Sequence, residues 1–409
     1  MKIGRFWIVL ASVAMMSGYG TGKAEAGAST FGEDLAFLER HTDVIVLLDA
    51  SGSGRVAVLP ALQGRAMTST AAGPAGLSFG WINRELIASG RTVPHINVFG
   101  GEDRFWIGPE GGQYSVFFKK GAAFDLEHWF TPAPIDTEPF DLVSKSRDRA
   151  VMKKDMRLEN YSGTVFTLRV DREIRILETD EAVRALGVKP AKTLSVVAFE
   201  SNNKITNTGK SAWTKDKGLL SIWILGMFNP SPATTVVVPF HQGPAGKLGA
   251  IVNDTYFGKV PADRLVIGKG VLYFHGDGQR RGKIGLTPQR AKAVLGSYDA
   301  ANKVLTIVQY TKPEGARDYV NSMWELQKEP YGGDVVNSYN DGPPKPGAKP
   351  LGPFYELETS SPAVALRPGE SLSHRHRTTH LQGPEADLDA VAKMVLGVTV
   401  SEIKSGLRM

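Results

Sequence analysis

The segment FGGEDRFWIGPEGGQ, residues 99–113, combines glycines, charged side chains and large aromatic rings in one short stretch. Glycine permits turns with positive φ and lets a ligand approach the backbone closely. A tryptophan offers a flat apolar face to the C–H bonds of a sugar ring, while arginine and carboxylate groups bind hydroxyls. The segment is therefore a candidate sugar-binding site that uses Glu102, Arg104, Trp106 and Glu110. The alternative is a structural pair of Arg104 with Glu110, with Trp106 in the core.

A second polar cluster lies in FYELET, residues 354–359. In a strand, Glu356 and Glu358 share one face, so their like charges repel and the pKa of one carboxyl group should rise. A carboxylate with a pKa near neutrality is suited to act as a general base at the anomeric hydroxyl of a sugar. The preceding NSYNDGP segment adds Asn340 and Asp341, which can bind hydroxyls. The alternative places both glutamates on an exposed face, in water.

Histidines supply the candidate general acids. His241 in PFHQG and His275 in YFHGDG each end a strand-like run at a glycine-rich turn, and sandwich proteins often carry functional residues at strand ends. Either histidine could donate a proton to a sugar. His374, His376 and His380 would share one face of a strand and could bind zinc, but no carboxylate completes a familiar zinc spacing. We therefore expect no metal and no other cofactor.

Several other function classes lack their motifs. The chain of 409 residues contains no cysteine, which excludes disulfides, thiolate nucleophiles and cysteine-bound metals. GDGQRRGK, residues 276–283, lacks the spacing of a phosphate-binding P-loop, although Arg280 and Arg281 could meet an acidic sugar. No G-x-S-x-G, H-E-x-x-H or Rossmann fingerprint occurs. The net charge of +6 is thinly spread, so we expect no nucleic-acid partner.

The elements that must position these residues are mainly strands. FTLRVDREIRI, residues 166–176, alternates apolar and polar side chains, and only Arg172 breaks the pattern. Such alternation predicts an antiparallel strand or hairpin with one face on a core. Further strand-like runs cover residues 43–49, 55–62, 96–100, 114–120, 194–200, 219–228, 234–240, 271–275 and 304–310. Together they predict an all-β sandwich or barrel.

Few segments have helical character. Short helices are predicted at residues 180–186 and 288–295, and a C-terminal helix at residues 385–396. NDGPPKPGAKPLGP, residues 340–353, is rich in proline and glycine and predicts an extended loop. Because strand-like segments lie on both sides of it, we interpret it as a loop within one domain rather than as a domain linker.

Three segments, in this order along the chain, resemble the galactose-mutarotase-like superfamily of β-supersandwiches. They are residues 99–113, the SNNKITNTG hairpin at residues 201–209, and FYELETSSPAVALRPGESLSHRHRTTHL at residues 354–381. In the last segment a glutamate-bearing strand is followed by a proline, a loop and an L-x-P-G-E turn that starts at Leu366. The resemblance implies a supersandwich of large antiparallel sheets with a few short peripheral helices. It also implies a carbohydrate ligand and a catalytic glutamate on the strand that carries Glu356 and Glu358.

The resemblance implies an aldose 1-epimerase-like isomerase as the enzyme class. One of the two glutamates would then be the base, with His241 or His275 as the acid. However, enzymes of the superfamily carry a histidine in an H-x-Y-F/W-N segment, and this chain has none. Binding of a carbohydrate is therefore better supported than its epimerisation. The competing interpretation is a non-catalytic structural or partner-binding β-sandwich module of the cell envelope.

The N-terminus has the pattern of an export signal. Lys2 and Arg5 precede the apolar run of residues 6–16, and Ala24-Glu25-Ala26 forms an A-x-A cleavage site. We expect residues 1–26 to be a signal peptide and residues 27–409 a single domain in the periplasm or outside the cell. The apolar run is short for a membrane span, which needs about 20 residues, so we expect no span in the mature chain.

Overall fold

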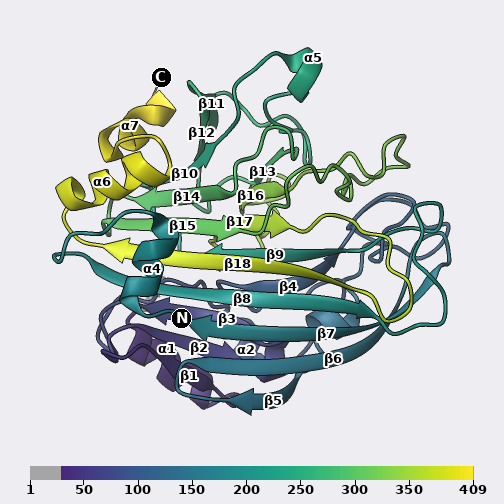
Figure 1. Ribbon diagram of the computed structural model, residues 1–409, viewed down its shortest axis with the longest axis horizontal. Coiled ribbons are helices and arrows are strands. Elements are labelled where there is room, and N and C mark those ends of the chain that lie inside the picture. Colours follow the sequence, from purple (N-terminus) through teal and green to yellow (C-terminus); the bar gives the residue numbers. More distant parts are fainter. Residues whose placement is uncertain (1–28, 409) are drawn as a thin grey trace, which may run out of the picture.

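The structure is a computed structural model that describes residues 29–408 and consists mainly of antiparallel strands (Figure 1). The predicted signal peptide lies outside the described residues. The strands form a ten-stranded sheet, β11-β12-β10-β14-β15-β18-β8-β7-β6-β5, a five-stranded sheet, β13-β16-β17-β9-β4, and a three-stranded sheet, β1-β2-β3. All pairings between these strands are antiparallel. The predicted fold class, all-β with large antiparallel sheets and a few short peripheral helices, is confirmed.

The strands have the following bounds. The ten-stranded sheet contains β5 (Asp141–Lys145), β6 (Arg149–Glu159), β7 (Val165–Ile176), β8 (Ser195–Asn207), β10 (Thr234–Pro239), β11 (Leu265–Ile267), β12 (Val271–His275), β14 (Val294–Asp299), β15 (Val304–Tyr310) and β18 (Ser371–Gln382). The five-stranded sheet contains β4 (Arg104–Gly108), β9 (Ser221–Phe228), β13 (Gly282–Leu286), β16 (Val336–Asn340) and β17 (Tyr355–Ser360). The three-stranded sheet contains β1 (Ile45–Leu48), β2 (Arg55–Leu59) and β3 (Arg65–Thr70).

Strand β7 shows how the alternating sequence produces a two-sided sheet. Its even-numbered side chains from Phe166 to Ile176 are buried, and its odd-numbered ones are exposed or half-buried. Arg172, which breaks the alternation in the sequence, is buried with the apolar residues. Its guanidinium binds a carboxylate oxygen of Asp103 at 2.6 Å and donates to the carbonyl oxygen of Gly64 at 3.0 Å. The arginine is tolerated in the core because its donors are satisfied there.

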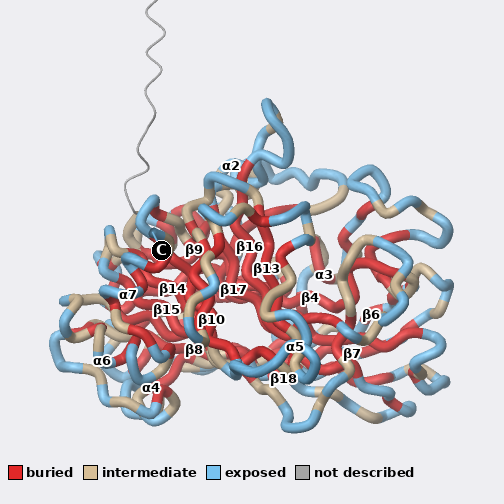
Figure 2. Tube along the Cα trace, turned by 90° about the horizontal axis from the view of Figure 1, so that it is seen from above, coloured by how far each residue is buried: buried red, intermediate tan, exposed pale blue. Residues whose placement is uncertain are grey.

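The five-stranded sheet packs with one face against the inner face of the ten-stranded sheet. The hydroxyl of Thr359 on β17 lies 2.8 Å from Nε2 of His374 and 2.9 Å from Nδ1 of His376, both on β18. The hydroxyl of Tyr355 on β17 lies 2.8 Å from that of Ser297 on β14. Figure 2 shows that the strands of both sheets are largely buried, whereas most connecting loops at the periphery are exposed. The other face of the five-stranded sheet remains available for a site.

The helices are short and peripheral. They are α1 (Phe31–Glu39), α2 (Arg84–Ser89), α3 (Ala133–Asp136), α4 (Thr179–Leu186), α5 (Ala245–Leu248), α6 (Glu385–Val395) and α7 (Val400–Ser405), with 3-10 turns at Pro60–Leu62 and Gly406–Arg408. Helices α4 and α6 confirm two of the predicted helices. None of the helices in residues 29–408 has the length and apolar character required to cross a membrane.

The helix predicted at residues 288–295 is wrong. A turn follows Thr287, and strand β14 begins at Val294 and pairs with β10 and β15. The guanidinium of Arg290 donates to the carbonyl oxygens of His241 and Gly249, at 2.9 and 2.7 Å, so it fixes this turn to a neighbouring loop. Sheet pairing and these hydrogen bonds therefore override a local helical signal.

Two of the predicted strands are also wrong, and both lie close to the segment of residues 99–113. Residues 96–100 and 114–120 form no regular strand, and they contribute only isolated bridges, such as that between Phe118 and Trp129. Glycine at positions 100 and 101 has φ of 101° and 112°, which extended L-residues do not adopt. The chain therefore turns here instead of continuing a sheet. The predicted loop at residues 340–353 is confirmed beyond Asn340, the last residue of β16.

Candidate functional site

A cavity of about 580 Å³ lies over the outer face of the five-stranded sheet. All five strands contribute side chains to its wall: Arg104 and Trp106 from β4, Trp223, Leu225 and Met227 from β9, Lys283 from β13, Tyr339 from β16 and Glu356 from β17. Loop residues complete the wall, including Glu110, Trp129, Phe257, Arg281, Trp324, Asp341 and Lys349. The volume lies within the range of about 300–1,000 Å³ that is usual for ligand pockets.

The register of the sheet brings these side chains together from distant parts of the sequence. Trp106 lies opposite Trp223, and Arg104 lies opposite Leu225. Glu356 lies between Tyr339 on one side and Met227 on the other. Because side chains two residues apart share a face of a strand, all of these groups point away from the ten-stranded sheet.

Two pairs of a basic side chain with a carboxyl group form the polar floor of the cavity. Nη2 of Arg104 lies 2.9 Å from Oε1 of Glu356, and Nζ of Lys283 lies 3.0 Å from Oε2 of Glu358. The indole N–H of Trp223 donates to the same oxygen of Glu358 at 3.0 Å. Glu356 is 5% exposed and Glu358 is fully buried. The alternative interpretation, two glutamates solvated on an exposed face, is therefore wrong.

Burial shifts the protonation of the carboxyl groups toward the neutral form. Burial raises the pKa of Glu356 to about 8, although the nearby Arg104 lowers it and Glu358 raises it further. Burial also raises the pKa of Glu110 and that of Asp341. A carboxyl group whose pKa lies near neutrality can both donate and accept a proton at physiological pH.

Lys283 stays charged in the same environment. Burial lowers its pKa, but the carboxylates of Glu358, Glu110 and Glu356 raise it more, and the net shift is upward. The ammonium group also lies over the ring of Trp223, 4.8 Å from its centroid. Lys283 therefore supplies a fixed positive charge at the floor of the cavity.

Tryptophans form an aromatic wall beside the ion pairs. The rings of Trp106 and Trp223 meet edge to face at 5.4 Å, and those of Trp129 and Trp324 stack at 5.7 Å. The guanidinium of Arg104 lies 4.3 Å from the centroid of Trp106. This wall offers flat apolar surfaces directly next to charged groups, which is the combination of surfaces that sugar rings require.

Several buried donors at the cavity have no acceptor within residues 29–408. The indole N–H groups of Trp106 and Trp129 have no partner, and neither has Nε of Arg104. Oε1 of Glu358, at the base of the same cluster, also lacks a partner. Buried polar groups in folded proteins are almost always hydrogen-bonded. These donors are candidates for hydrogen bonds to acceptors supplied by a ligand.

The structure brings together most of the side chains that the sequence suggested for a site. Arg104, Trp106, Glu110, Asp341 and Glu356 all line the cavity, and Glu358 lies beneath it. The structural pair of Arg104 with Glu110 does not form, because Arg104 binds Glu356 instead.

Two of the suggested binding residues lie elsewhere. Glu102 accepts a hydrogen bond from the backbone N–H of Ser69 and lies 2.7 Å from Nε2 of His380, between the sheets. Asn340 donates to Asp277 Oδ1 at 3.0 Å and to the carbonyl oxygen of Arg280 at 2.9 Å, so it holds a turn. Both side chains have structural partners and are absent from the cavity lining.

The two histidines suggested as acids also lie outside the cavity lining. The side chain of His241 is exposed, and that of His275 is half-buried with Nδ1 3.7 Å from a carboxylate oxygen of Asp277. Burial lowers the pKa of His241 and, together with Arg264, that of His275. Neither histidine is positioned to share a substrate with Glu356 in this cavity.

Sequence reasoning missed Lys283, Tyr339 and three of the four tryptophans at the cavity. The alternation of side chains along a strand could have predicted some of these residues. Tyr339 lies within NSYNDGP, but its face of β16 is opposite to that of Asn340, and only Tyr339 lies beside Glu356. Trp129 and Trp324 belong to irregular segments, for which no periodicity exists.

The remaining histidines have structural roles. Burial lowers the pKa of His374 to about 3 and that of His376 to about 4, so both are neutral where they bind Thr359. His380 lies between Thr306 and Glu102, with its ring stacked on Phe79 at 4.3 Å. Among residues 29–408, no group of three or more histidine, aspartate or glutamate side chains is arranged to hold a metal ion.

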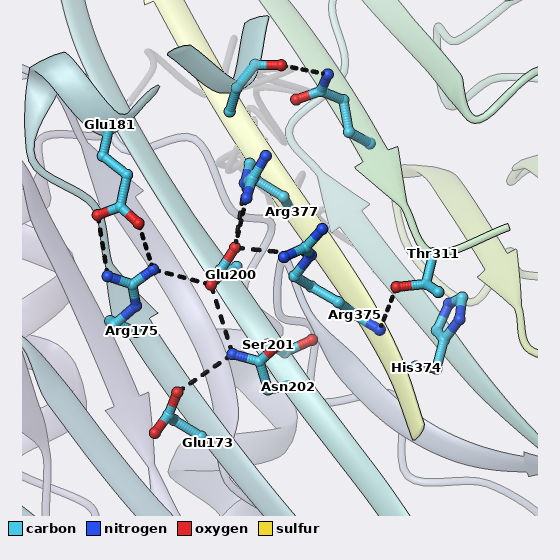
Figure 3. Close-up of polar contacts among 12 residues, drawn as sticks. Glu173, Arg175, Glu181, Glu200, Ser201, Asn202, Thr311, His374, Arg375 and Arg377 are labelled. Atoms are coloured by element: carbon cyan, nitrogen blue, oxygen red, sulfur yellow. Dashed lines mark hydrogen bonds and ion pairs between the residues drawn. The ribbon is translucent and has the colours of Figure 1, made fainter. Parts of the chain in front are cut away.

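A second cluster of ion pairs lies on the outer face of the ten-stranded sheet (Figure 3). Glu200 on β8 accepts from Arg175 on β7 at 3.0 Å and from Arg377 on β18 at 2.8 Å, and Nε of Arg375 lies 4.0 Å away. Arg175 also binds both carboxylate oxygens of Glu181, at 2.9 and 2.6 Å. This cluster ties three neighbouring strands and helix α4 together.

The chain belongs to the family described as "Family of unknown function (DUF6786)", whose family model matches residues 29–407. No curated protein matches the sequence. The fold is similar to that of a protein from Synechocystis sp. PCC 6803, with 11% identity, coverage of 83% of this chain and 96% of that chain, and a TM-score of 0.49.

Two other solved structures have comparable similarity. A putative aldose 1-epimerase from Escherichia coli K12 is 14% identical, with 84% of this chain and 99% of that chain covered and a TM-score of 0.45. A galactose mutarotase-like protein from Lactobacillus casei is 9% identical, with 83% of this chain and all (100%) of that chain covered and a TM-score of 0.46. These likenesses concern the fold alone.

Proposed function

We propose that this protein binds a carbohydrate in the cavity over the five-stranded sheet. One observation supports this function above the others: buried tryptophan and arginine donors without acceptors line the same cavity as a carboxyl group whose pKa is about 8. Trp106 and Trp129 each offer an apolar ring face and a free N–H group. A sugar matches both features, because it presents C–H bonds on the faces of its ring and oxygen acceptors around its edge.

Glu356 makes proton exchange with the bound sugar chemically feasible. In the interconversion of anomers, a base removes the proton of the anomeric hydroxyl while the bond from the anomeric carbon to the ring oxygen breaks. An acid then protonates the ring oxygen, and the open-chain aldehyde closes on its other face. Glu356 would supply one of these proton transfers, and Glu110 or Asp341, both at the cavity with raised pKa values, would supply the other.

We also propose that the mature protein is exported, beginning at Gly27, on the basis of the N-terminal sequence pattern. Mass spectrometry of the protein purified from its native host tests this proposal. A mature N-terminus at Gly27 would support it, and recovery of peptides from residues 1–23 in the mature protein would contradict it.

The binding proposal is tested by thermal denaturation of the mature chain in the presence of mono- and oligosaccharides. A ligand at one hundred times its dissociation constant should stabilise the folded state by about 2.7 kcal/mol. Sorbitol at the same concentration controls for the general stabilising effect of polyols. If no neutral or acidic glycan raises the transition temperature above that of the sorbitol control, the structural or partner-binding interpretation replaces this one.

A further inference from the structure

The basic side chains at the cavity differ in whether they have a carboxylate partner. Arg104 is paired with Glu356, and Lys283 is paired with Glu358. Arg281 also lines the cavity, but within residues 29–408 its guanidinium forms no hydrogen bond or ion pair, and it lies 3.8 Å from the centroid of the Phe257 ring. Arg281 therefore presents its donors, held in a fixed plane against an aromatic ring, to whatever occupies the cavity.

The position of Arg281 favours contact with one end of a ligand. It immediately precedes strand β13, which is the edge of the five-stranded sheet, and it is two residues before Lys283. Arg281 is half-buried, whereas Lys283 is buried on the floor. Lys349, from the loop between β16 and β17, adds a second unpaired cation to the cavity wall and is exposed. The tryptophans and these two cations thus form separate parts of one cavity.

The nearby carboxyl groups of Asp341 and Glu356 are bonded to groups other than Arg281. Asp341 already accepts from the hydroxyl of Tyr339 at 2.7 Å and from the backbone N–H of Gly352 at 2.8 Å. Burial raises the pKa of Glu356 to about 8, and Glu356 is bonded to Arg104 rather than to Arg281. Arg281 and Lys349 are therefore the cations of the cavity wall that have no hydrogen bond or ion pair to a carboxylate within residues 29–408.

We infer that the ligand of this cavity is a sugar acid, with its ring against the tryptophans and its carboxylate bound by Arg281. This inference rests on the proposed carbohydrate binding and specifies the class of sugar. The planar guanidinium can hold a carboxylate through two parallel hydrogen bonds, which is its preferred geometry. A neutral hexose would leave the donors of Arg281 without an anionic partner.

The test is calorimetric titration of the mature protein with galacturonate, glucuronate and mannuronate, singly and as short oligomers. Each acid is compared with its neutral parent sugar, which lacks the carboxylate, and with its methyl ester, which removes the charge and adds one methyl group. We expect an acid to bind about 10- to 100-fold more tightly than its ester. The preference should decrease as the salt concentration rises, because Arg281 is partly exposed to solvent.

Two variants locate the effect. Arg281→Gln should abolish the preference for the acid over its ester. Arg280→Gln removes the same charge from the neighbouring residue, which is largely exposed and absent from the cavity lining, so the preference should persist. Circular dichroism of both variants confirms that they fold.

The outcomes separate this inference from the binding proposal. Equal affinity for acid and ester, or loss of the preference in Arg280→Gln as well, overturns the sugar-acid inference while carbohydrate binding stands. Tighter binding of glucose 6-phosphate than of any uronate also overturns it, in favour of a phosphorylated sugar. If no compound in the panel binds, both proposals fail.

Discussion

Two clusters of arginine and glutamate side chains lie on the outer faces of the ten-stranded and the five-stranded sheet. The pKa of the central glutamate shifts in opposite directions in the two clusters. On the ten-stranded sheet, hydrogen bonds from Arg175 and Arg377 lower the pKa of Glu200, although burial raises it. On the five-stranded sheet, burial raises the pKa of Glu356 to about 8 even though Arg104 lies 2.9 Å away. Three arginine side chains lie near the carboxylate of Glu200. Glu356, by contrast, contacts one arginine, Arg104, and lies close to Glu358.

The comparison of the two clusters suggests how a ligand-binding site can be distinguished from a network of ion pairs that only stabilises the fold. Charge pairs occur in both clusters, and a short list of ion pairs would not separate them. The Glu200 cluster joins strands β7, β8 and β18 through charged hydrogen bonds that satisfy its carboxylate. The cluster beneath the cavity leaves donors of Arg104 and Trp106 unsatisfied. Under the proposed function, the unsatisfied buried donors beside the cavity distinguish this cluster from that of Glu200, whereas the presence of charge does not.

The largest expected difference between the two clusters concerns catalysis. If the protein interconverts anomers, Glu356→Gln should reduce the rate about 10²- to 10⁴-fold, because the amide keeps the shape but cannot transfer the proton. Polarimetry on a freshly dissolved reducing sugar, chosen by the binding screen, measures this rate. Glu200→Gln is the matched control and should leave the rate unchanged.

Two outcomes of the polarimetry would contradict catalysis by Glu356. One is a wild-type protein that binds a reducing sugar but leaves anomer exchange at the rate of the buffer, which restricts the function to binding. The other is an equal loss of rate in both variants, which would show that the substitutions act through stability.

The second prediction concerns stability. Here the substitution in the Glu200 cluster should have the larger effect. Glu200→Gln should lower the free energy of unfolding by about 1.5–3 kcal/mol, the usual contribution of hydrogen bonds to a charged group. Three arginines near Glu200 would lose their shared carboxylate. Urea denaturation measures the change, and sugar affinity should stay at the wild-type value. A change in affinity without a change in stability would contradict the structural role.

The sequence predicted the sheets better than the site, and the reason is physical. Alternation along β7 follows from the period of a strand and is visible locally, so its buried face is predictable. The pairing of Arg104 with Glu356 joins residues 252 positions apart. It depends on the order β17-β9-β4 within a sheet, which no local pattern specifies.

The residues of the opening segment illustrate the same limit. Glycine-rich loops and charges predicted a polar site, and Arg104, Trp106 and Glu110 do line the cavity. Glu102 belongs to the same segment but precedes β4 and turns toward His380 between the sheets. The composition therefore identified a segment that lines the cavity. Which of its side chains point into the cavity could be predicted only if the first residue of the strand were known.

The third prediction uses pH to separate the clusters. Because the pKa of Glu356 is raised to about 8 in the folded chain from an ordinary value of 4.5, the folded protein retains a proton that the unfolded chain has lost. Relative to Glu356→Gln, the stability of the wild type should therefore fall as the pH rises from 6.5 to 8, by up to about 1.4 kcal/mol per pH unit. Glu356→Gln should lack this slope, measured by urea denaturation across the window.

Other groups that titrate near this window are present in both wild type and Glu356→Gln, so the difference between the two proteins isolates the contribution of Glu356. The pKa values of His374 and His376 are lowered from an ordinary value of 6.5 to about 3 and 4, so these groups make stability rise with pH up to about 7, equally in wild type and in Glu356→Gln. The pKa of Glu200 is also lowered, so its stabilisation is lost only at acidic pH, and Glu200→Gln should keep the wild-type slope. Equal slopes in wild type and Glu356→Gln would mean that Glu356 is ionised in the folded protein.

The smallest expected effect isolates a single donor in the cavity. Trp106→Phe keeps an aromatic ring but removes the indole N–H, which is buried and has no acceptor within residues 29–408. If a bound sugar accepts from this group, its affinity should fall about 2- to 10-fold, the usual net effect of one neutral hydrogen bond. Trp213→Phe is the control, since Trp213 is equally buried but is absent from the cavity lining. Titration calorimetry with the same sugar should show no loss for the control. If Trp106→Phe binds as tightly as the wild type, the free indole donor is a feature of packing, and the distinction drawn between the two clusters loses one of its supports.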